Sequence, residues 1–382
     1  MRKADAWVLY AGDGARGRGH LVRETIELPA LREGEVLAEP LFGSWEANMT
    51  HAIERVPVDV CRVRGEEKII LGNSGVVRVL EVGSEVRGVE PGQCAMIFGG
   101  RGLEDRHGYP TKILGFDAPG TMGCLATRMT LNHRQLMLLP EGTRFSLPQW
   151  AAFAVRYVCA WSNWRLAWGM FRLQIEDASA PLTNVWGWGG GTTLAELDLA
   201  RRFGCRTVMC SGTDAHLREI QRYGITAVDR RPFGSLDYDQ TRAEHDPAYL
   251  TRYREAERRF LDAMTRLTNG DGVQIFVDHI GGPLQRATIK ALSREAVLAT
   301  AGWKAGKHLW YLRPSACIAR QQFIHTHGAS WSEGIAAMAY AEANGWLPHV
   351  DDRIYTFDEV PELAQAYSAN ETGMFPCFSI GA

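Results

Sequence analysis

The sequence predicts an α/β protein that combines a doubly wound parallel sheet with a second, β-rich domain. Its length of 382 residues favours two domains. Residues 1–150 are rich in glycine, proline and short β-type runs. From about residue 150 onward strand and helix signals alternate, which is the pattern of a parallel sheet. The hydrophobic fraction of 46% and the charged fraction of 23% are ordinary for a globular protein.

Charge and cysteine usage exclude several functional classes. The 42 Lys and Arg residues and the 44 Asp and Glu residues give a net charge of -2. Neither nucleic acid nor an anionic membrane is therefore expected as the main partner. The eight cysteines are dispersed and form no C-x-x-C pair, which indicates reduced thiols rather than a disulfide framework or a zinc site. Because the sequence shows neither a signal-peptide pattern nor a run of about 18 apolar residues, we expect a cytoplasmic protein.

In the β-rich region, turn residues separate short runs of β-forming side chains. The strands expected here are 36–41, 69–71, 76–80 and 95–98. Glu90-Pro91-Gly92 fits a tight turn before the last of these strands. No long helix is expected in this region.

The following region should hold parallel strands separated by helices. The expected strands are 183–187, 207–210, 273–278 and 296–300. A helix from about Thr193 to Phe203 follows the first strand, and a second helix ends at Gly224. Helices near 332–344 and 359–369 come later, and a strand at 374–380 is expected to return to the first domain.

An insert at about 232–267 interrupts this alternation. Its second half is predicted to be a helix in which Asp246 supplies the cap and Pro247 occupies the first turn. One face of this helix is marked by apolar side chains, namely Leu250, Tyr253, Phe260, Leu261, Met264 and Leu267.

The strongest chemical signal is a glycine-rich loop between the first strand and the first helix of the parallel region. Glycines there let the backbone approach a pyrophosphate, and the helix N-terminus presents free N–H groups. The residues expected to bind the cofactor here are Gly187, Gly189, Gly190, Gly191, Thr192 and Thr193. A threonine replaces the usual last glycine, which should loosen the packing of helix on strand. Dinucleotide binding on a Rossmann-type sheet is favoured over a purely structural turn.

The end of the second parallel strand favours NADPH over NADH. An NAD site places an acidic residue there to bind the ribose 2′-hydroxyl. Here the strand runs into Ser211, Gly212 and Thr213, and the later Asp214 is more simply a helix cap. These small residues leave room for a 2′-phosphate, and His216 and Arg218 nearby supply positive charge. We expect Ser211, Gly212, Thr213 and His216 to contact the cofactor.

Together these features resemble the medium-chain dehydrogenase/reductase superfamily over essentially the whole chain. The ordered segments that carry the resemblance, besides the glycine loop, are 6–9, 34–37, 71–75, 81–84 and 89–92. The resemblance implies a GroES-like catalytic domain, 1–152 with 325–382, and a Rossmann domain, 153–324. It also implies a homodimer or homotetramer. Cys159 lies near the position of a nicotinamide-contacting threonine of the family, although a buried thiol is the alternative reading.

Zinc-dependent members of the superfamily have a Cys and a His-Glu pair at positions that this chain fills differently. The matching residues are Trp45 and Asn73-Ser74, and Cys124 alone remains in the region of the four-cysteine structural lobe. The resemblance therefore implies a zinc-independent enzyme with no metal site.

Within the superfamily the chain is most similar to the crotonyl-CoA carboxylase/reductase branch. The resemblance rests on the segment 246–260 of the insert, placed before Asp271-Gly272-Val273, and on 113–117 leading to 134–140. That branch reduces a 2-enoyl-CoA with NADPH and can trap the enolate with carbon dioxide. A thioester bound to a carrier protein is an alternative substrate. The resemblance implies that the partner is a small-molecule substrate and not a membrane.

The carbon dioxide pocket of that branch contains an Asn, a Phe-Glu pair and a His. The residues that match are Asn48, Phe116, Asp117 and His327, with Asp117 in the place of the Glu. The resemblance implies that Asn48 orients the substrate, Phe116 excludes water, and His327 donates a hydrogen bond or proton while Asp117 fixes its tautomer. The shorter carboxylate leaves carboxylation open. The alternative for each residue is a purely structural role. Asn48 would then be a loop amide, Phe116 a core aromatic, Asp117 a turn residue and His327 a structural histidine.

Two further functions and one further pocket stay open. The chain could reduce a carbonyl, quinone or other non-thioester molecule, or bind NADPH with little catalysis. Trp161, Trp164 and Trp168 have helical spacing, which indicates one packed face, with an aromatic-walled substrate pocket as the alternative.

Overall fold

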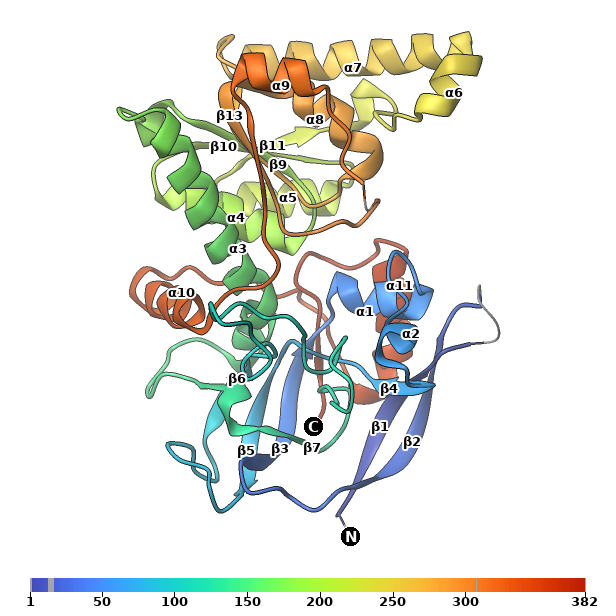
Figure 1. The fold of residues 1–382 in the computed structure, drawn as a ribbon, viewed down its shortest axis with the longest axis vertical. Helices are drawn as coiled ribbons and strands as arrows, with labels where there is room; N and C mark the ends of the chain where they lie inside the picture. Colours follow the sequence, from blue (N-terminus) through green and yellow to red (C-terminus); the bar gives the residue numbers. More distant parts are fainter. Residues whose placement is uncertain (1, 13–16, 307, 382) are drawn as a thin grey trace. The chain divides into compact units, whose positions relative to one another are not determined.

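The computed structural model describes residues 2–12, 17–306 and 308–381 (Figure 1). The chain packs as two compact units, Met1–Val158 with Gly328–Ala382, and Cys159–His327. The limits expected from the sequence, at 152/153 and 324/325, remain predictions about the domains. In the described ranges, no helix combines the length and the apolar character needed to cross a membrane.

The first unit is rich in antiparallel strands, as the sequence predicts. One sheet has the order β2-β1-β4 and another has the order β15-β16-β3-β5-β6-β8, with β7 paired to β3. The strands are β1 (Arg2–Tyr10), β2 (His20–Leu28), β3 (Glu35–Ser44), β4 (Lys68–Ile70), β5 (Gly75–Val82), β6 (Cys94–Ile97), β7 (Met129–Asn132), β8 (Leu136–Leu138), β15 (Ile354–Tyr355) and β16 (Cys377–Ser379). The strand expected near the C-terminus does return, because β16 pairs with β3 in antiparallel register.

Short helices connect these strands. They are α1 (Ala47–Glu54), α2 (Val60–Arg64), α10 (Trp331–Asn344) and α11 (Val360–Ser368), with the 3-10 turns His133–Gln135 and Phe357–Glu359. The core of this unit includes the fully buried Trp45 and the nearly buried Phe116. Both are candidate site positions, so the core and the candidate site share side chains.

The second unit is built on a parallel sheet in the order β11-β10-β9-β12-β13-β14. The strands are β9 (Asn184–Trp188), β10 (Arg206–Ser211), β11 (Thr226–Asp229), β12 (Val273–Asp278), β13 (Leu292–Thr300) and β14 (Gln322–His325). Every neighbouring pair is parallel. The strand order reverses between β9 and β12, which is the point where doubly wound sheets bind ligands. This is the Rossmann order, and it confirms the predicted fold class.

Helices accompany this sheet (Figure 1). They are α4 (Gly191–Arg202), α5 (Asp214–Arg222), α6 (Gln240–His245), α7 (Pro247–Leu267), α8 (Gln285–Ala291) and α9 (Arg313–Ala319), with the 3-10 turns Ala180–Leu182, Arg231–Phe233 and Gly282–Leu284. The longest helix, α3 (Leu147–Gln174), contributes its residues from Cys159 on to this unit. The sequence indicated it only through the spacing of its tryptophans.

The insert forms α6 and α7, and its predicted cap is confirmed. The side chain of Asp246 accepts a hydrogen bond of 2.8 Å from the backbone N–H of Tyr249, and Pro247 is the first residue of α7. Phe260 is buried against Trp188, with ring centroids 5.2 Å apart. Leu267, predicted to face inward, is 44% exposed. The predicted face is wrong there because it runs to the end of the helix, where the chain turns away.

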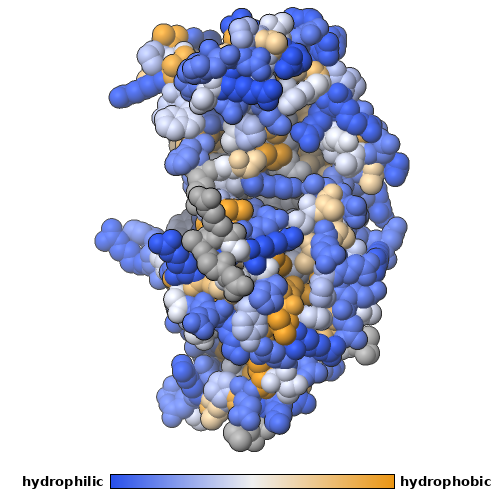
Figure 2. Space-filling model, turned by 90° about the vertical axis from the view of Figure 1, so that its right-hand side faces the viewer, coloured by the Kyte–Doolittle hydropathy of each residue, from blue (hydrophilic) through white to orange (hydrophobic). Residues whose placement is uncertain are grey.

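Hydrophilic side chains cover most of the face shown in Figure 2, and hydrophobic ones gather in small separate areas. Small apolar areas of this kind are ordinary on soluble protein surfaces.

Candidate functional site

The glycine loop joins β9 to α4 at the switch point of the parallel sheet. β9 ends at Trp188, and α4 begins at Gly191. The residue before the helix, Gly190, offers no side-chain cap to the first turn. The first N–H groups of α4 therefore remain available to an anion, and the helix dipole favours negative charge there. This arrangement fits a nucleotide diphosphate.

Thr193 packs tightly against the loop, contrary to the expectation that its packing would be loosened. Thr193 is fully buried. A Cβ added at Gly187 would lie 2.7 Å from its methyl group, and one added at Gly189 would lie 2.1 Å from its hydroxyl oxygen. The absence of side chains at these two glycines makes room for the threonine, so the helix and the strand stay in close contact. Thr192, the other threonine, is only half-buried.

The end of β10 has the small, polar character that the sequence indicates. Ser211 is buried, and Thr213 caps α5 by accepting from the backbone N–H of His216. Asp214 is paired with Arg231 at 2.5 Å, so its carboxylate is engaged as a partner of an arginine. The predicted cap at Asp214 is wrong, because Thr213 is the cap of α5 and Asp214 is the first residue of the helix.

Arg230 is a residue that the sequence reasoning missed. It directly follows β11, whose residue Asp229 lies beside Ser211 of β10. Its guanidinium lies against Gly212, because a Cβ added there would be 3.0 Å from Nε of Arg230. A guanidinium in this position can bind a phosphate with two parallel hydrogen bonds. The signal that could have found it is the register of β10 and β11, which one sequence does not reveal.

A cavity of about 310 Å³ lies at the carboxyl ends of β12, β13 and β14. It is lined by residues of the strand ends and the following loops, including Asp278, Thr300, Ala301, Trp303, Thr326 and His327. The His327 ring is exposed and lies 5.4 Å from the Trp303 ring, measured between centroids. His327 is thus a cavity residue at the end of a strand. Cys159, the other predicted contact near the cofactor ring, is half-buried in α3 and does not line this cavity.

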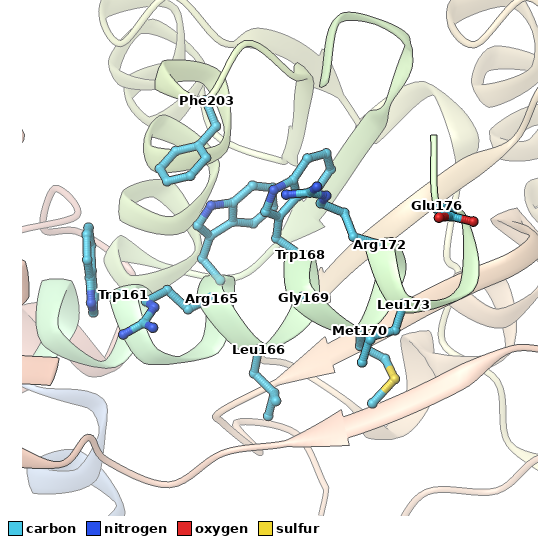
Figure 3. A pocket seen from close by; sticks show the side chains of 11 residues that line it. Trp161, Arg165, Leu166, Trp168, Gly169, Met170, Arg172, Leu173, Glu176 and Phe203 are labelled. Atoms are coloured by element: carbon cyan, nitrogen blue, oxygen red, sulfur yellow. The ribbon is translucent and has the colours of Figure 1, made fainter. Parts of the chain in front are cut away.

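A second hollow of about 700 Å³ lies along α3. Trp161 and Trp164 are buried, as a packed face requires, whereas Trp168 is half-buried and stacks on Trp164 with 5.6 Å between the ring centroids. The Phe203 ring meets the Trp164 ring edge-on, with 5.9 Å between the ring centroids. In Figure 3, Leu166 points to another side of the helix from Trp168. The three tryptophans that the sequence offers as a possible aromatic pocket line this hollow, whereas none of the predicted cofactor-binding or catalytic residues does.

Asn48 lies in the first unit, in the first turn of α1. Its amide nitrogen donates to Oδ1 of Asn73 at 3.2 Å. Its side-chain amide oxygen, Oδ1, is buried and finds no hydrogen-bond donor among the described residues. A buried amide oxygen without a donor costs free energy, so Asn48 has a free acceptor for a ligand.

Phe116 and Asp117 sit in a loop that the rest of the first unit holds firmly. Phe116 is buried, and its carbonyl accepts from the guanidinium of Arg64 at 3.2 Å. Oδ1 of Asp117 accepts from the backbone N–H of Ile113 at 2.7 Å. One carboxylate oxygen of Asp117 thus closes a turn, and the other remains for further contacts. His327 belongs to the second unit, so its joint action with these residues remains a prediction.

The positions that match zinc ligands in the superfamily serve the core. The indole of Trp45 donates to Oγ1 of Thr50 at 3.0 Å. Burial raises the pKa of the Cys124 thiol to about 12, and this thiol donates to the backbone carbonyl of Ser74 at 3.5 Å. In the described ranges, no three His, Cys, Asp or Glu side chains are grouped as a metal ion would require.

A buried ion pair lies next to Trp45. Arg156 donates to Oε1 of Glu46 at 2.7 Å and to the hydroxyl of Ser44 at 2.6 Å. Burial raises the pKa of Glu46, while the Arg156 charge and the hydroxyls of Ser74 and Ser44 oppose the rise. The pair holds the turn before α1, and therefore Asn48, to the start of α3.

No protein-family model matches the chain, and neither does any curated protein. Solved structures, in contrast, share its fold, and that fold is the one found in medium-chain dehydrogenases and reductases, a Rossmann-type sheet domain with a β-rich GroES-like domain. One is crotonyl-CoA carboxylase/reductase AntE in complex with NADP, with 19% identity, a TM-score of 0.79, and coverage of 99% of this chain and 94% of that one.

Two further solved structures are similar to the chain over almost its whole length. The 2-octenoyl-CoA carboxylase reductase CinF, in complex with NADP and 2-octenoyl-CoA, has 18% identity and a TM-score of 0.77, over 99% of this chain and 88% of that one. The alcohol dehydrogenase of the archaeon Aeropyrum pernix has 18% identity and a TM-score of 0.76, over 98% of this chain and 100% of that one. The fold that the sequence resemblance implies is confirmed.

Proposed function

We propose that the protein is a zinc-independent reductase that transfers hydride from NADPH to a conjugated enoyl thioester, carried by CoA or by a carrier protein. The observation that carries the cofactor part is the uncapped start of α4 behind a glycine loop at the switch point of the sheet. Two of the similar structures, AntE and CinF, are complexes with NADP.

The enoyl thioester part rests on the resemblance and on what replaces the zinc ligands. CinF was solved with 2-octenoyl-CoA, and the chain carries the predicted insert as α6 and α7. The position of the family's zinc-binding Cys is filled by Trp45, which is wholly buried. A conjugated thioester needs no Lewis acid if hydrogen-bond donors stabilise the charge that develops on its oxygen.

In the proposed mechanism the described residues bind, orient and exclude water. NADPH, when bound, supplies the hydride. The α4 N-terminus holds the diphosphate, and the 310 Å³ cavity takes the reduced ring. His327, at the edge of that cavity, donates a hydrogen bond or proton. Asn48 orients the substrate through its free amide oxygen, and Phe116 keeps water from the reacting carbon.

The first test is to follow NADPH absorbance with crotonyl-CoA and longer 2-enoyl thioesters, with and without bicarbonate. We expect NADPH oxidation with at least one enoyl thioester, and a lower rate with NADH. Failure with every enoyl thioester, together with turnover of a carbonyl or quinone, would replace this proposal with that of a non-thioester reductase. NADPH binding without any turnover would make the protein a binder.

Comparing the assays with and without bicarbonate tests carboxylation separately from reduction. Asp117 already accepts the Ile113 N–H with one oxygen, and it is one methylene shorter than the Glu of the carboxylating branch. We therefore expect reduction that does not depend on bicarbonate. A carboxylated product, detected by mass spectrometry, would restore the carboxylating function. The cytoplasmic location and the dimeric or tetrameric state stay predictions.

Arg230 should decide the preference for NADPH over NADH. We expect Arg230→Gln to raise the Kd for NADPH about tenfold and to leave the Kd for NADH unchanged, because a charge-assisted hydrogen bond contributes about 1.5 kcal/mol or more. Fluorescence titration measures both constants. Arg222→Gln, at the last residue of α5, is the matched control and should change neither constant. An equal loss of affinity for both nucleotides would argue against a 2′-phosphate contact.

A further inference from the structure

A buried carboxylate lies at the centre of a hydrogen-bonded chain in the second unit. Glu196 of α4 is fully buried. Each of its two oxygens lies 3.1 Å from the amide nitrogen of Asn163 in α3. One of the oxygens also lies 3.4 Å from Nε2 of His279, just after β12. The carboxylate thus joins three segments that are distant in the sequence.

The carboxylate fixes the direction of the hydrogen bonds on the Asn163 side. An ionised carboxylate has no hydrogen to donate, so Asn163 must turn its NH2 group toward Glu196. The amide oxygen of Asn163 then points the other way, where Oγ1 of Thr326 lies at 3.0 Å. That bond forms only if the hydroxyl of Thr326 donates. Its hydrogen is used inside the protein, and its lone pairs are left for a ligand.

The His279 side follows the same rule. The backbone N–H of Ala301 lies 3.0 Å from Nδ1 of His279, so Nδ1 is the acceptor. In a neutral imidazole the proton is then on Nε2, which faces Glu196. The Asn163 branch therefore donates to the carboxylate, and on the His279 branch the Nε2 hydrogen faces the carboxylate without an aligned hydrogen bond. Their outer ends, Ala301 and Thr326, both line the 310 Å³ cavity.

We propose that Glu196 sets the hydrogen-bond polarity of this cavity. It makes the Thr326 hydroxyl an acceptor, which binds the carboxamide N–H of the reduced nicotinamide ring and so fixes the orientation of the ring. The inference rests on the proposed function, because that function places the ring in this cavity. Glu196 is a positioning residue: it acts through Asn163 and Thr326 and touches neither substrate nor cofactor.

A glutamine at position 196 reverses the chain without changing its size. The Gln NH2 group donates to the amide oxygen of Asn163, and the Asn163 NH2 group then donates to Oγ1 of Thr326. This orientation of the Gln amide is favoured because its oxygen then faces Nε2 of His279 and its NH2 group faces Asn163, so the substitution keeps the side-chain volume and leaves a partner for each group. The hydroxyl hydrogen of Thr326 is turned toward the cavity, which now presents a donor to the ligand.

The test compares the Kd of NADPH with that of its reduced 3-acetylpyridine analogue, in which a methyl group replaces the carboxamide NH2. Because burial raises the pKa of Glu196, the fluorescence titrations are made at pH 8 to favour the carboxylate. We expect wild type to prefer NADPH about fivefold, as one hydrogen bond implies. Glu196→Gln and Thr326→Val should each abolish this preference, and Thr326→Ser, which keeps the hydroxyl, should retain it.

Glu257→Gln is the matched control, because Glu257 is another buried carboxylate of the second unit. It contacts Tyr253 and Lys290 rather than the cavity, so the preference should stay at the wild-type value. An unchanged preference in both Glu196→Gln and Thr326→Val would overturn the inference alone. Wild-type protein that binds neither nucleotide would overturn the proposed function as well. If the wild type and the variants show the expected preferences for NADPH over the analogue, but the protein reduces no enoyl thioester, the inference stands and the proposed substrate is overturned.

Discussion

Gly190→Ala is expected to weaken NADPH binding roughly 100-fold while leaving the folded protein intact. A Cβ added at this position has no heavy atom of the structure within 4 Å, and the backbone φ of -108° is open to any residue. The added methyl group projects from the residue that precedes the first turn of α4, where the diphosphate is proposed to lie. Overpacking a close contact costs about 1–3 kcal/mol, and each 1.4 kcal/mol corresponds to a factor of ten in Kd.

Calorimetric titration with NADPH measures this effect, and thermal unfolding of the free protein checks the fold. Gly169→Ala is the control, because Gly169 lies within α3 and an added Cβ there also meets open space. It should leave NADPH affinity unchanged and stabilise the helix by roughly 0.5–1 kcal/mol. Wild-type affinity in Gly190→Ala would show that the diphosphate does not approach this loop.

Arg156→Met should destabilise the protein by about 3–5 kcal/mol, because it leaves Glu46 as an uncompensated buried charge. Arg156 is 2% exposed and donates to Glu46, to the Ser44 hydroxyl and to the carbonyl of Trp45. Methionine fills part of the volume but supplies none of these hydrogen bonds. Urea denaturation, followed by tryptophan fluorescence and circular dichroism, measures the loss.

The pH dependence of this variant identifies the buried carboxylate as the cause. Burial raises the pKa of Glu46, and removal of Arg156 takes away a charge that opposes the rise. A carboxyl whose pKa is higher in the folded state stabilises the fold at low pH and loses that contribution as pH rises through the folded pKa. Arg156→Met should therefore be less destabilised at pH 5 than at pH 8. Adding Glu46→Gln to Arg156→Met should recover stability at pH 8. A loss of stability that changes neither with pH nor with the Glu46→Gln substitution would contradict the explanation.

Much of the fold could be predicted because its signals are local. The strand, the glycine loop and the start of α4 follow one another within ten residues, and each element has its own chemical reason. The cap of α7 at Asp246 is equally local. The helix α3 was harder, since its long apolar sequence lacks the polar face that marks an amphipathic helix.

The candidate site was predicted less completely because its parts come from separate segments. Arg230 reaches Gly212 only because β11 lies beside β10. The turn that Asp117 closes depends on a backbone N–H four residues away, which a residue type alone does not reveal. Glu196 looks like an ordinary helix residue until Asn163 and His279 are placed around it.

The amino-acid order by itself determined the parallel sheet, the glycine loop and the small residues at the end of β10, because hydrophobic periodicity and turn chemistry act between neighbours in the chain. Only the tertiary structure decided which buried charges meet which donors. A buried carboxylate must find its hydrogen bonds wherever the fold provides them, and for Glu196 and Glu46 those partners come from elements far away in the sequence.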